Sequence, residues 1–452
     1  MYENLKFGKD FVWGVATSSY QIEGGHNEGG RSLSIWDTFS HTYGKVKNFE
    51  NGDVACDHYH RMDEDIALLK ELGVKAYRFS ISWSRLLPDG FNPSQEGIDF
   101  YNRLINKLLE NGIQPFLTMY HWDLPQSLQN NGGWENREII DWFDNYSSKI
   151  VEYFGDRVKH MITLNEPSIF VNHGYKEGIY APGLRLDNSK IVNIVHNVLC
   201  AHGKAVKNAR RYNDIEIGIT LANNPMIPDT SDDFNIKQAR KSQDYTGDDG
   251  PFFLFSMRLW GDPIFYGKYA DGYFNRFGKD IKIEDGDMEL ISQKLDFVGI
   301  NTYTGNRVGI KNGKLNFYGY MTGMPMNSVG WRNEPDSLYY VTKYFHNAYH
   351  IPIYITENGY TIQDNVCLDG KVHDAQRIDY IERYLNGLKK AQNEGIDIRG
   401  YFYWSFMDNF EWADGYTPRF GLVFIDFLNN ERTRIPKDSY YWYKGLINDN
   451  SK

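Results

Sequence analysis

The sequence predicts an α/β protein with the (β/α)8 TIM-barrel architecture. Three observations predict it. Short, almost continuously apolar runs recur along the chain, as expected for parallel strands that are buried on both faces. Amphipathic helical patterns lie between several of these runs, and the runs reach a count of eight. Polar side chains, finally, gather at the carboxyl ends of most runs, which is where barrels of this type place their chemistry.

The strands and helices follow from local patterns. Three helices are expected at Asp63–Leu72, Phe100–Glu110 and Ile378–Gln392, because apolar residues recur there every three or four positions. Gly73 stops the first of them, as glycine commonly does at a helix end. The expected strands are Phe11–Thr17, Ala76–Ser82, Gln114–Tyr120, His160–Asn165, Ile215–Ala222, Phe297–Tyr303, Pro352–Asn358 and Arg399–Ser405.

The length of 452 residues suits one large barrel with elaborated loops after its strands. No linker rich in proline, serine or glycine divides the chain, and no short repeat or low-complexity tract is visible. We therefore expect residues 1–452 to form a single domain.

Composition and charge indicate which kinds of partner and which cellular compartment to expect. The net charge of −10 is spread along the chain, which disfavours nucleic acid as a partner. The three cysteines are far apart and show no disulfide or zinc spacing, which fits a reducing compartment. No segment has the apolar length of a signal core or a membrane span. We expect a cytoplasmic protein that binds neither nucleic acid nor membranes.

The polar residues at the strand ends are expected to converge on one pocket, because the barrel brings the carboxyl ends of its strands together. Aromatic residues make up 16% of the chain, and several of them flank these polar positions, where flat rings offer faces for sugar C–H groups. The residues concerned are Gln21, Arg78, His121, Trp122, Asn165, Glu166, Asn301, Tyr303, Glu357 and Trp404.

Glu166 and Glu357 carry the predicted chemistry. Each follows an apolar run and has an asparagine beside it. Two carboxyl groups in one cavity can cleave an acetal if one is protonated and the other ionised. Glu357 is the ionised member if Arg78 lies beside it, and Glu166 is then the acid. Their separation decides between retention and inversion of configuration, and the residues alone leave that open.

These residues also admit other interpretations. Pro167 restricts Glu166 to extended conformations, so this segment alone could be an ordinary turn. A non-catalytic sugar-binding protein is disfavoured because both carboxylates are present. A phosphate-binding barrel needs a glycine-rich loop after strand seven or eight, and only Asn358-Gly359 is found there.

A metal enzyme is a further alternative. Asp57, His58, His60 and Asp63 form a cluster of possible ligands. The two histidines are only two positions apart at a helix entry, however, so they do not share a helical face. A solvated helix start explains the cluster better, and we expect neither a metal nor a cofactor.

Several ordered motifs resemble glycoside hydrolase family 1, and the resemblance to its β-glucosidases covers almost the whole chain. The matching segments are Phe11–Gly24, Tyr77–Trp83, Tyr120–Pro125, Thr163–Pro167, Gly299–Tyr303, Ile355–Gly359, Trp404–Trp412 and Arg419–Leu422. Such resemblance implies a retaining mechanism on a small-molecule β-glycoside. It makes Glu357 the nucleophile and Glu166 the acid that later acts as base.

The resemblance also implies roles for the surrounding residues. Arg78 and Tyr303 contact Glu357, Asn165 binds the 2-hydroxyl, and Trp404 forms the platform under the sugar. Asn301 is expected beside this group, and Trp331 is expected to line the leaving-group site. The remaining hydroxyls fall to Gln21, His121, Glu411 and Trp412, with Trp122 behind the same subsite.

Two branches of the family are disfavoured by single positions. The 6-phospho-β-glycosidases carry Ser, Lys and Tyr where this chain has Glu411, Pro418 and Phe420, and a buried Glu411 would repel a phosphate. The thioglucosidase-like branch replaces the acid with glutamine, whereas Glu166 is present here. The preference among glucoside, galactoside and fucoside stays open, as does a homo-oligomeric state.

Overall fold

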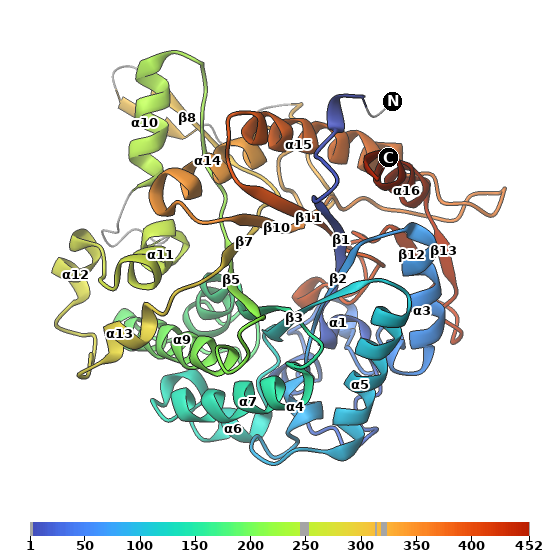
Figure 1. Ribbon diagram of the computed structural model, residues 1–452, viewed down its shortest axis with the longest axis horizontal. Helices are drawn as coiled ribbons and strands as arrows, with labels where there is room; N and C mark the ends of the chain where they lie inside the picture. The colour runs from blue at the N-terminus through green and yellow to red at the C-terminus, as the bar shows by residue number, and fades with distance from the viewer. Residues whose placement is uncertain (1–2, 245–252, 312–313, 318–322, 452) are drawn as a thin grey trace.

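The computed structural model describes residues 3–244, 253–311, 314–317 and 323–451 (Figure 1). In this part of the chain, eight parallel strands close into a barrel in the order β1-β11-β10-β7-β5-β4-β3-β2. Their bounds are β1 Val12–Ala16, β2 Ala76–Ser80, β3 Gln114–Tyr120, β4 His160–Asn165, β5 Glu216–Ala222, β7 Phe297–Asn301, β10 Ile353–Asn358 and β11 Ile398–Trp404. The predicted barrel is confirmed, and each predicted strand matches one barrel strand within two residues at either end.

Helices surround the barrel on its outside (Figure 1). None of the described helices combines the length and apolar character that a membrane crossing requires. The helices are α1 Ser19–Ile22, α2 Ile35–Ser40, α3 His58–Leu72, α4 Trp83–Leu86, α5 Gln95–Glu110, α6 Gln126–Asn130, α7 Ile139–Phe154, α8 Pro167–Ile169, α9 Asn188–Ala209, α10 Asp233–Gln243, α11 Met257–Tyr266, α12 Asp271–Phe277, α13 Asp287–Ile291, α14 Ser337–Tyr349, α15 Ala375–Asn393 and α16 Asp438–Asn450.

The three predicted helices exist but begin earlier than predicted. Helix α5 starts at Gln95, five residues before the predicted Phe100, and the Ser94 hydroxyl accepts a hydrogen bond from the amide of Gly97. This is the usual contact of a serine that caps a helix. The apolar periodicity reports only the buried face of a helix, so it misses first turns that are largely polar.

Two small sheets add to the barrel and were not predicted. Strands β6 (Met226–Pro228), β8 (Asn306–Lys311) and β9 (Lys314–Phe317) form one of them, beside α10 (Figure 1). Strands β12 (Val423–Ile425) and β13 (Arg434–Pro436) form the other. These strands are three to six residues long, too short to give a distinct pattern in the sequence.

Aromatic side chains fill the part of the barrel interior that lies away from the carboxyl ends of the strands. The rings of Phe116 and Phe402 lie 4.7 Å apart and belong to a buried cluster that also contains Phe297. Glycines make the room for these rings. A β-carbon on Gly14 would lie 2.4 Å from the ring of Phe402, and one on Gly218 would lie 2.5 Å from that of Phe297. Because the bottom is filled, the barrel's polar chemistry is confined to the carboxyl ends of its strands.

Register shifts interrupt the pairing of two strands close to the glutamates. Glu357 lies near the end of β10, and Glu166 follows β4 directly. Pairing of β10 with β7 shifts between Ile355 and Glu357, and pairing of β4 with β5 shifts between Ile162 and Asn165. Such bulges re-aim a side chain that strict alternation would send to the other face. They bring Glu357 and Asn165 into the barrel.

A buried ion network holds the long loop after β11. Lys437 and Arg377 are fully buried, and the Lys437 amine contacts both Asp364 and Asp408. Arg377 contacts Asp364 at 2.8 Å, and Arg419 contacts Asp408 at 2.7 Å. Each carboxylate therefore has two cationic partners, which compensates the cost of burying charge. The network fixes the segment that delivers Glu411 and Trp412 to the barrel mouth.

Candidate active site

Glu357 is held by two donors at the end of β10. Arg78 on β2 donates from its guanidinium to Oε1 at 2.6 Å, and the Tyr303 hydroxyl donates to Oε2 at 2.6 Å. Arg78 is fully buried and also donates to the backbone oxygen of Thr356 and the hydroxyl of Thr118. Both contacts expected for Glu357 are thus present, and each favours its ionised form.

Glu166 stands opposite, in an unusual backbone conformation. Its φ of 47° and ψ of 62° lie in the left-handed region, which non-glycine residues seldom occupy. The expectation that Pro167 would hold Glu166 extended is therefore wrong. Surrounding contacts override the local preference: the Glu166 amide donates to the oxygen of Thr220 on β5, and Asn301 donates to Glu166 Oε1 at 2.9 Å. Residues held in this way cluster at functional sites.

The two carboxyl groups differ in protonation. Burial, reinforced by the negative charge of Glu357, raises the pKa of Glu166 to about 8. Burial also raises the pKa of Glu357, but the Arg78 guanidinium and the Tyr303 hydroxyl oppose this rise, and neither of them hydrogen-bonds Glu166. Glu357 consequently ionises first, and Glu166 retains its proton at neutral pH. The roles predicted from the neighbouring residues match this electrostatic asymmetry.

Asn165 and His121 form an oriented pair. Asn165 accepts at Oδ1 from Arg78 at 2.6 Å and from Asn301 at 3.1 Å, so its amide nitrogen must face His121. That nitrogen lies 3.0 Å from His121 Nε2, which accepts. Burial, with Arg78 nearby, holds the pKa of His121 well below its usual range. The neutral ring therefore carries its proton on Nδ1, which has no partner among the described residues and is free to donate to a ligand.

An aromatic wall lines the mouth above these residues. The ring of Trp122 lies 4.6 Å from that of Trp412, and Trp404 lies 5.9 Å from the His121 ring. The sequence reasoning missed two members of this wall. Trp36 packs 4.5 Å from Trp412, and Tyr180 packs 5.9 Å from Trp122. Both lie in segments that follow barrel strands, Trp36 in α2 and Tyr180 before α9, and only the high aromatic content of the chain hinted at them.

Gln21 and Glu411 differ in how many of their hydrogen-bonding atoms are already bonded within the protein. Gln21 donates its amide hydrogens to Asn409 and to the backbone of Phe410, so only its carbonyl oxygen has capacity left for a ligand. Glu411 Oε2 is buried and has no hydrogen-bond partner among the described residues. Burial, with Asp414 and the two glutamates nearby, holds its pKa well above the usual range. A buried carboxyl oxygen without a partner can accept hydrogen bonds from a ligand.

Trp331 lies at the outer edge of this group. The residue is 37% exposed, and its ring lies 5.3 Å from that of Tyr303 and 6.1 Å from that of Phe420. Trp122 donates its indole N–H to the backbone oxygen of Asn165 at 2.8 Å, which ties the aromatic wall to the polar floor. These contacts bring the predicted site residues together at the carboxyl ends of the strands.

The acidic and histidine cluster near the start of α3 is already paired. His60 contacts Asp57 at 2.6 Å through Nδ1 and Glu28 at 3.0 Å through Nε2. His58 turns away to contact Asp65 at 2.8 Å. The residues do not converge on one point, so a helix start with local hydrogen bonds describes them.

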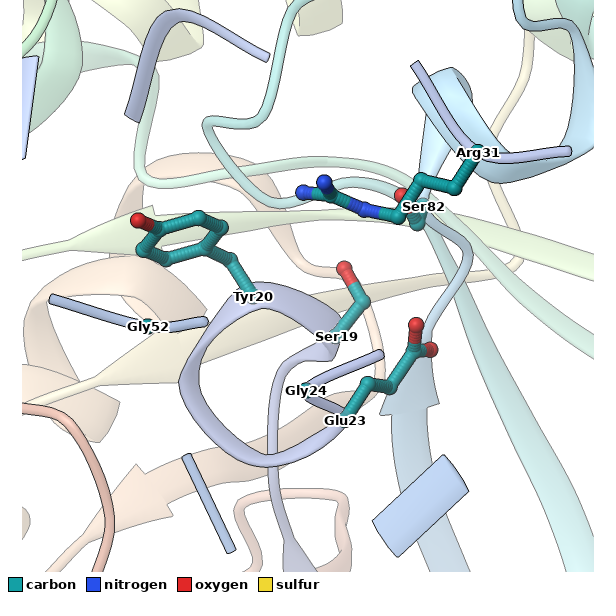
Figure 2. Close-up of a pocket in the computed structure, with 7 residues that line it drawn as sticks. All are labelled: Ser19, Tyr20, Glu23, Gly24, Arg31, Gly52 and Ser82. Atoms are coloured by element: carbon teal, nitrogen blue, oxygen red, sulfur yellow. The ribbon is translucent and has the colours of Figure 1, made fainter. Parts of the chain in front are cut away.

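A small cavity lies beside α1, which carries Gln21. Its volume is about 10 Å³, roughly the space of one water molecule and too small for a sugar. Figure 2 shows the guanidinium of Arg31 reaching into this region toward Tyr20. The cavity is lined by Ser19, Tyr20, Glu23, Gly24, Arg31, Gly52 and Ser82.

Two carboxyl groups held in opposite protonation states above a plugged barrel define a class of enzyme. The reaction that such a pair supports is acid-assisted cleavage of an acetal, and this is the chemistry of glycoside hydrolases. Sequence comparison gives the family. Residues 3–452 match the model of glycosyl hydrolase family 1, and the chain belongs to that family.

Known relatives align over nearly their full length. Beta-glucosidase A of Thermotoga maritima is 46% identical, over 98% of each chain. A 1,4-beta-D-glucan glucohydrolase of Thermotoga neapolitana is also 46% identical, over 98% of this chain and 99% of the relative. A family 1 β-glucosidase structure from T. maritima with isofagomine lactam superposes with a TM-score of 0.89, at 46% identity, over 98% of this chain and 99% of the other. The T. maritima enzyme has also been solved with galacto-hydroximolactam, with a TM-score of 0.89 at 45% identity over 99% of each chain.

Proposed function

We propose that the chain is a retaining β-glucosidase that releases terminal, non-reducing β-D-glucosyl residues. One observation carries the proposal: Glu166 and Glu357 share one hydrogen-bond network, yet only Glu357 is bound by both Arg78 and Tyr303. That difference separates a nucleophile from an acid. The names of the T. maritima and T. neapolitana relatives support glucose as the sugar.

The reaction follows from the two protonation states. In the first step, a Glu357 oxygen attacks the anomeric carbon while Glu166 gives its proton to the departing glycosidic oxygen. The carbon–oxygen bond breaks and an ester of glucose with Glu357 forms. In the second step, Glu166 takes a proton from water, whose oxygen attacks the same carbon and releases Glu357. The two inversions leave the configuration unchanged.

The hydrogen-bond network supports a short distance between the carboxyl groups. Asn301 donates to Glu166 at 2.9 Å and lies near enough to Glu357 to lower the pKa of that group. The charge of Glu357 in turn raises the pKa of Glu166, as expected for two carboxyl groups that are close neighbours. Retaining enzymes hold their carboxyl groups about 5–5.5 Å apart and inverting enzymes about 6.5–9.5 Å apart, so this proximity supports retention.

Neighbouring side chains have matching roles in this proposal. Asn165 presents an amide hydrogen to the 2-hydroxyl, and His121 Nδ1 donates to a further hydroxyl. Trp404 supports the face of the sugar. Gln21, Glu411 and Trp412 receive the remaining hydroxyls, and Trp331 with Phe420 borders the leaving group.

Cello-oligosaccharides or aryl and alkyl β-glucosides are the proposed substrates. Trp331 is partly exposed and packs beside Tyr303 and Phe420, where its ring can offer an aromatic face to the leaving group. The name of the T. neapolitana glucohydrolase also points to glucans.

Side activity on β-galactosides and β-fucosides is part of the proposal. Glu411 can accept hydrogen bonds from a hydroxyl in more than one orientation, because its Oε2 has no fixed partner among the described residues. The galacto-hydroximolactam complex of the T. maritima enzyme fits this tolerance. A 6-phosphate would instead meet a carboxyl group, and we expect it to be rejected.

The setting of the reaction is also inferred. We place the whole of residues 1–452 in one catalytic domain, since a single family model spans 3–452. The cysteines Cys56, Cys200 and Cys367 are free thiols, which suits a reducing cytoplasm.

A kinetic panel tests the proposed function. Aryl β-glucoside and cellobiose should be the best substrates by kcat/KM, aryl galactoside and fucoside should be slower, and 6-phosphoglucoside should not react. Glu411→Ser should lower kcat/KM for the glucoside by about 10–100-fold, the effect of losing two buried hydrogen bonds to the sugar. A preference for 6-phosphoglucoside in the unaltered enzyme would overturn the proposal.

A further inference from the structure

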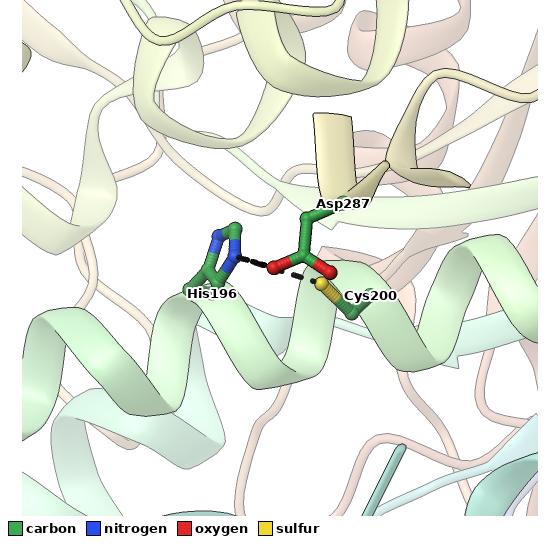
Figure 3. Close-up of side chains that lie close together, drawn as sticks. All are labelled: His196, Cys200 and Asp287. Atoms are coloured by element: carbon green, nitrogen blue, oxygen red, sulfur yellow. Dashed lines mark hydrogen bonds and ion pairs between the residues drawn. The ribbon is translucent and has the colours of Figure 1, made fainter. Parts of the chain in front are cut away.

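Three potential metal ligands meet outside the active site. His196 and Cys200 lie on α9, four positions apart and therefore on one face of the helix, and Asp287 is the first residue of α13. All three are buried. Figure 3 shows the imidazole, the thiol and the carboxylate turned toward one another between these elements. In the proposed reaction none of these side chains has a role.

The donor atoms are already near the spacing of a metal site. His196 Nε2 lies 2.9 Å from Asp287 Oδ2, and Cys200 Sγ lies 3.7 Å from His196 Nε2. One ligand atom from each residue falls within 4.8 Å of the other two. Bond lengths of about 2.0 Å to nitrogen and 2.3 Å to sulfur place ligands of tetrahedral zinc roughly 3.3–3.7 Å apart. Shifts below about 1 Å would therefore seat an ion.

The cluster also has the outer partners that metal ligands require. The Tyr269 hydroxyl lies 2.8 Å from Nδ1 of His196, the ring nitrogen that faces away from the cluster. Arg137 donates to both oxygens of Asp287 at 2.8 and 2.9 Å, and the Glu284 amide donates to Oδ2 at 2.8 Å. Contacts of this kind orient the side chains that bind a metal directly, and they fix the tautomer of a ligating histidine.

We propose that His196, Cys200 and Asp287 form a structural site for a thiophilic divalent cation of the zinc type, with water as the fourth ligand. Nitrogen, sulfur and carboxylate oxygen are the donor set that zinc prefers, whereas calcium and magnesium prefer oxygen alone. This proposal departs from the expectation that the chain binds no metal, and it does so for this site alone. The spacing in sequence could not show it, because Asp287 is far along the chain from the helix pair.

Metal binding has a defined proton balance. Without a metal ion, the Nε2 proton of His196 lies in the hydrogen bond to Asp287. The ion would take the place of this proton. Binding removes the Cys200 proton to solvent and leaves His196 neutral, with its proton on Nδ1 toward Tyr269. Burial raises the pKa of the Cys200 thiol to about 12, with Asp287 and Glu284 adding to the shift and Arg137 opposing it. One proton is thus released per ion, and affinity rises with pH.

Helix α9 links this site to the barrel. The hydroxyl of Thr163 on β4 lies 2.7 Å from Nδ1 of His202, which follows Cys200 by two positions on α9. β4 ends at Asn165, and Glu166 follows directly. An ion that ties α9 to α13 would therefore stabilise the support of the catalytic strand without touching the substrate, so the expected effect is on unfolding and not on turnover.

A cadmium titration tests the proposal. The Cys367→Ser variant serves as the reference protein, because Cys367 is the partly exposed thiol and would bind cadmium by itself. This variant should bind one Cd²⁺ with a thiolate charge-transfer band in the ultraviolet, and excess Zn²⁺ should remove the band. The melting temperature should rise by a few degrees in either metal. Adding Cys200→Ser should abolish the band and the shift while keeping hydrolysis of aryl glucoside.

A second measurement needs no change at the site. Iodoacetamide alkylation of Cys200 in the Cys367→Ser protein, followed by mass spectrometry, should be slowed by Zn²⁺ and should recover after chelation. Absence of a cadmium band in metal excess, or a band that survives Cys200→Ser, would overturn the proposal. Either result would assign the three residues to a purely hydrogen-bonded cluster.

Discussion

Replacing Tyr303 by phenylalanine tests how the protein keeps Glu357 ionised. The substitution removes the hydroxyl that donates to Glu357 Oε2 at 2.6 Å and leaves the ring in place. A hydrogen bond to a charged group is worth about 1.5–3 kcal/mol. At about 1.36 kcal/mol per pKa unit, its loss should raise the pKa of Glu357 by about 1–2 units. The ionised nucleophile then persists only at higher pH.

The assay is the pH profile of kcat/KM for an aryl β-glucoside. Tyr303→Phe should move the acidic limb upward by about 1–2 units and lower the rate on that limb by roughly 10–100-fold. The basic limb, which belongs to Glu166, should stay near its original position. Tyr403→Phe is the matched control, since that buried hydroxyl donates to the backbone oxygen of Phe420 and does not touch Glu357. An acidic limb that moves equally in both variants, or in neither, refutes the reasoning.

Further predictions concern Glu166 and the buried ion network. The fold raises the pKa of Glu166 to about 8, so the stability linked to this group is complete below its unfolded pKa of about 4.3 and is lost as pH rises toward 8. Glu166→Gln should therefore melt at a higher temperature than the unaltered enzyme at pH 8 but not at pH 4, and calorimetry at both pH values checks this. Glu166→Ala should slow substrates with poor leaving groups far more than activated ones; equal losses would contradict the acid role. Lys437→Met should lower the free energy of unfolding by about 3 kcal/mol, measured by urea denaturation, because it strips a cation from Asp364 and Asp408.

The barrel could be predicted because its signals are local. Nearly continuous apolar runs such as Phe297–Ile300 mark buried strands, and the strand-end position of Glu166 and Glu357 follows directly from the barrel. The partners of Glu357 were predicted from the resemblance of whole motifs to a family. Arg78 and Tyr303 are far apart in sequence, and no spacing rule joins them.

Other features depend on tertiary context that a sequence does not display. The left-handed backbone of Glu166 contradicts the preference that Pro167 imposes, because contacts from β5 and β7 override it. The register shift that re-aims Glu357 has no residue signature. Trp36 on α2 joins the aromatic wall only through tertiary packing, and the strands of the small sheets are too short to give a distinct pattern.

The assignment of Glu357 as nucleophile is tested most directly by the product of azide rescue. Glu357→Gly removes the attacking carboxylate and opens space beside the anomeric carbon, so hydrolysis of an aryl β-glucoside should be lost. Added azide should restore turnover by one direct displacement, and NMR should identify an α-glucosyl azide. A β-glucosyl azide, or near-normal hydrolysis without azide, would contradict the assignment.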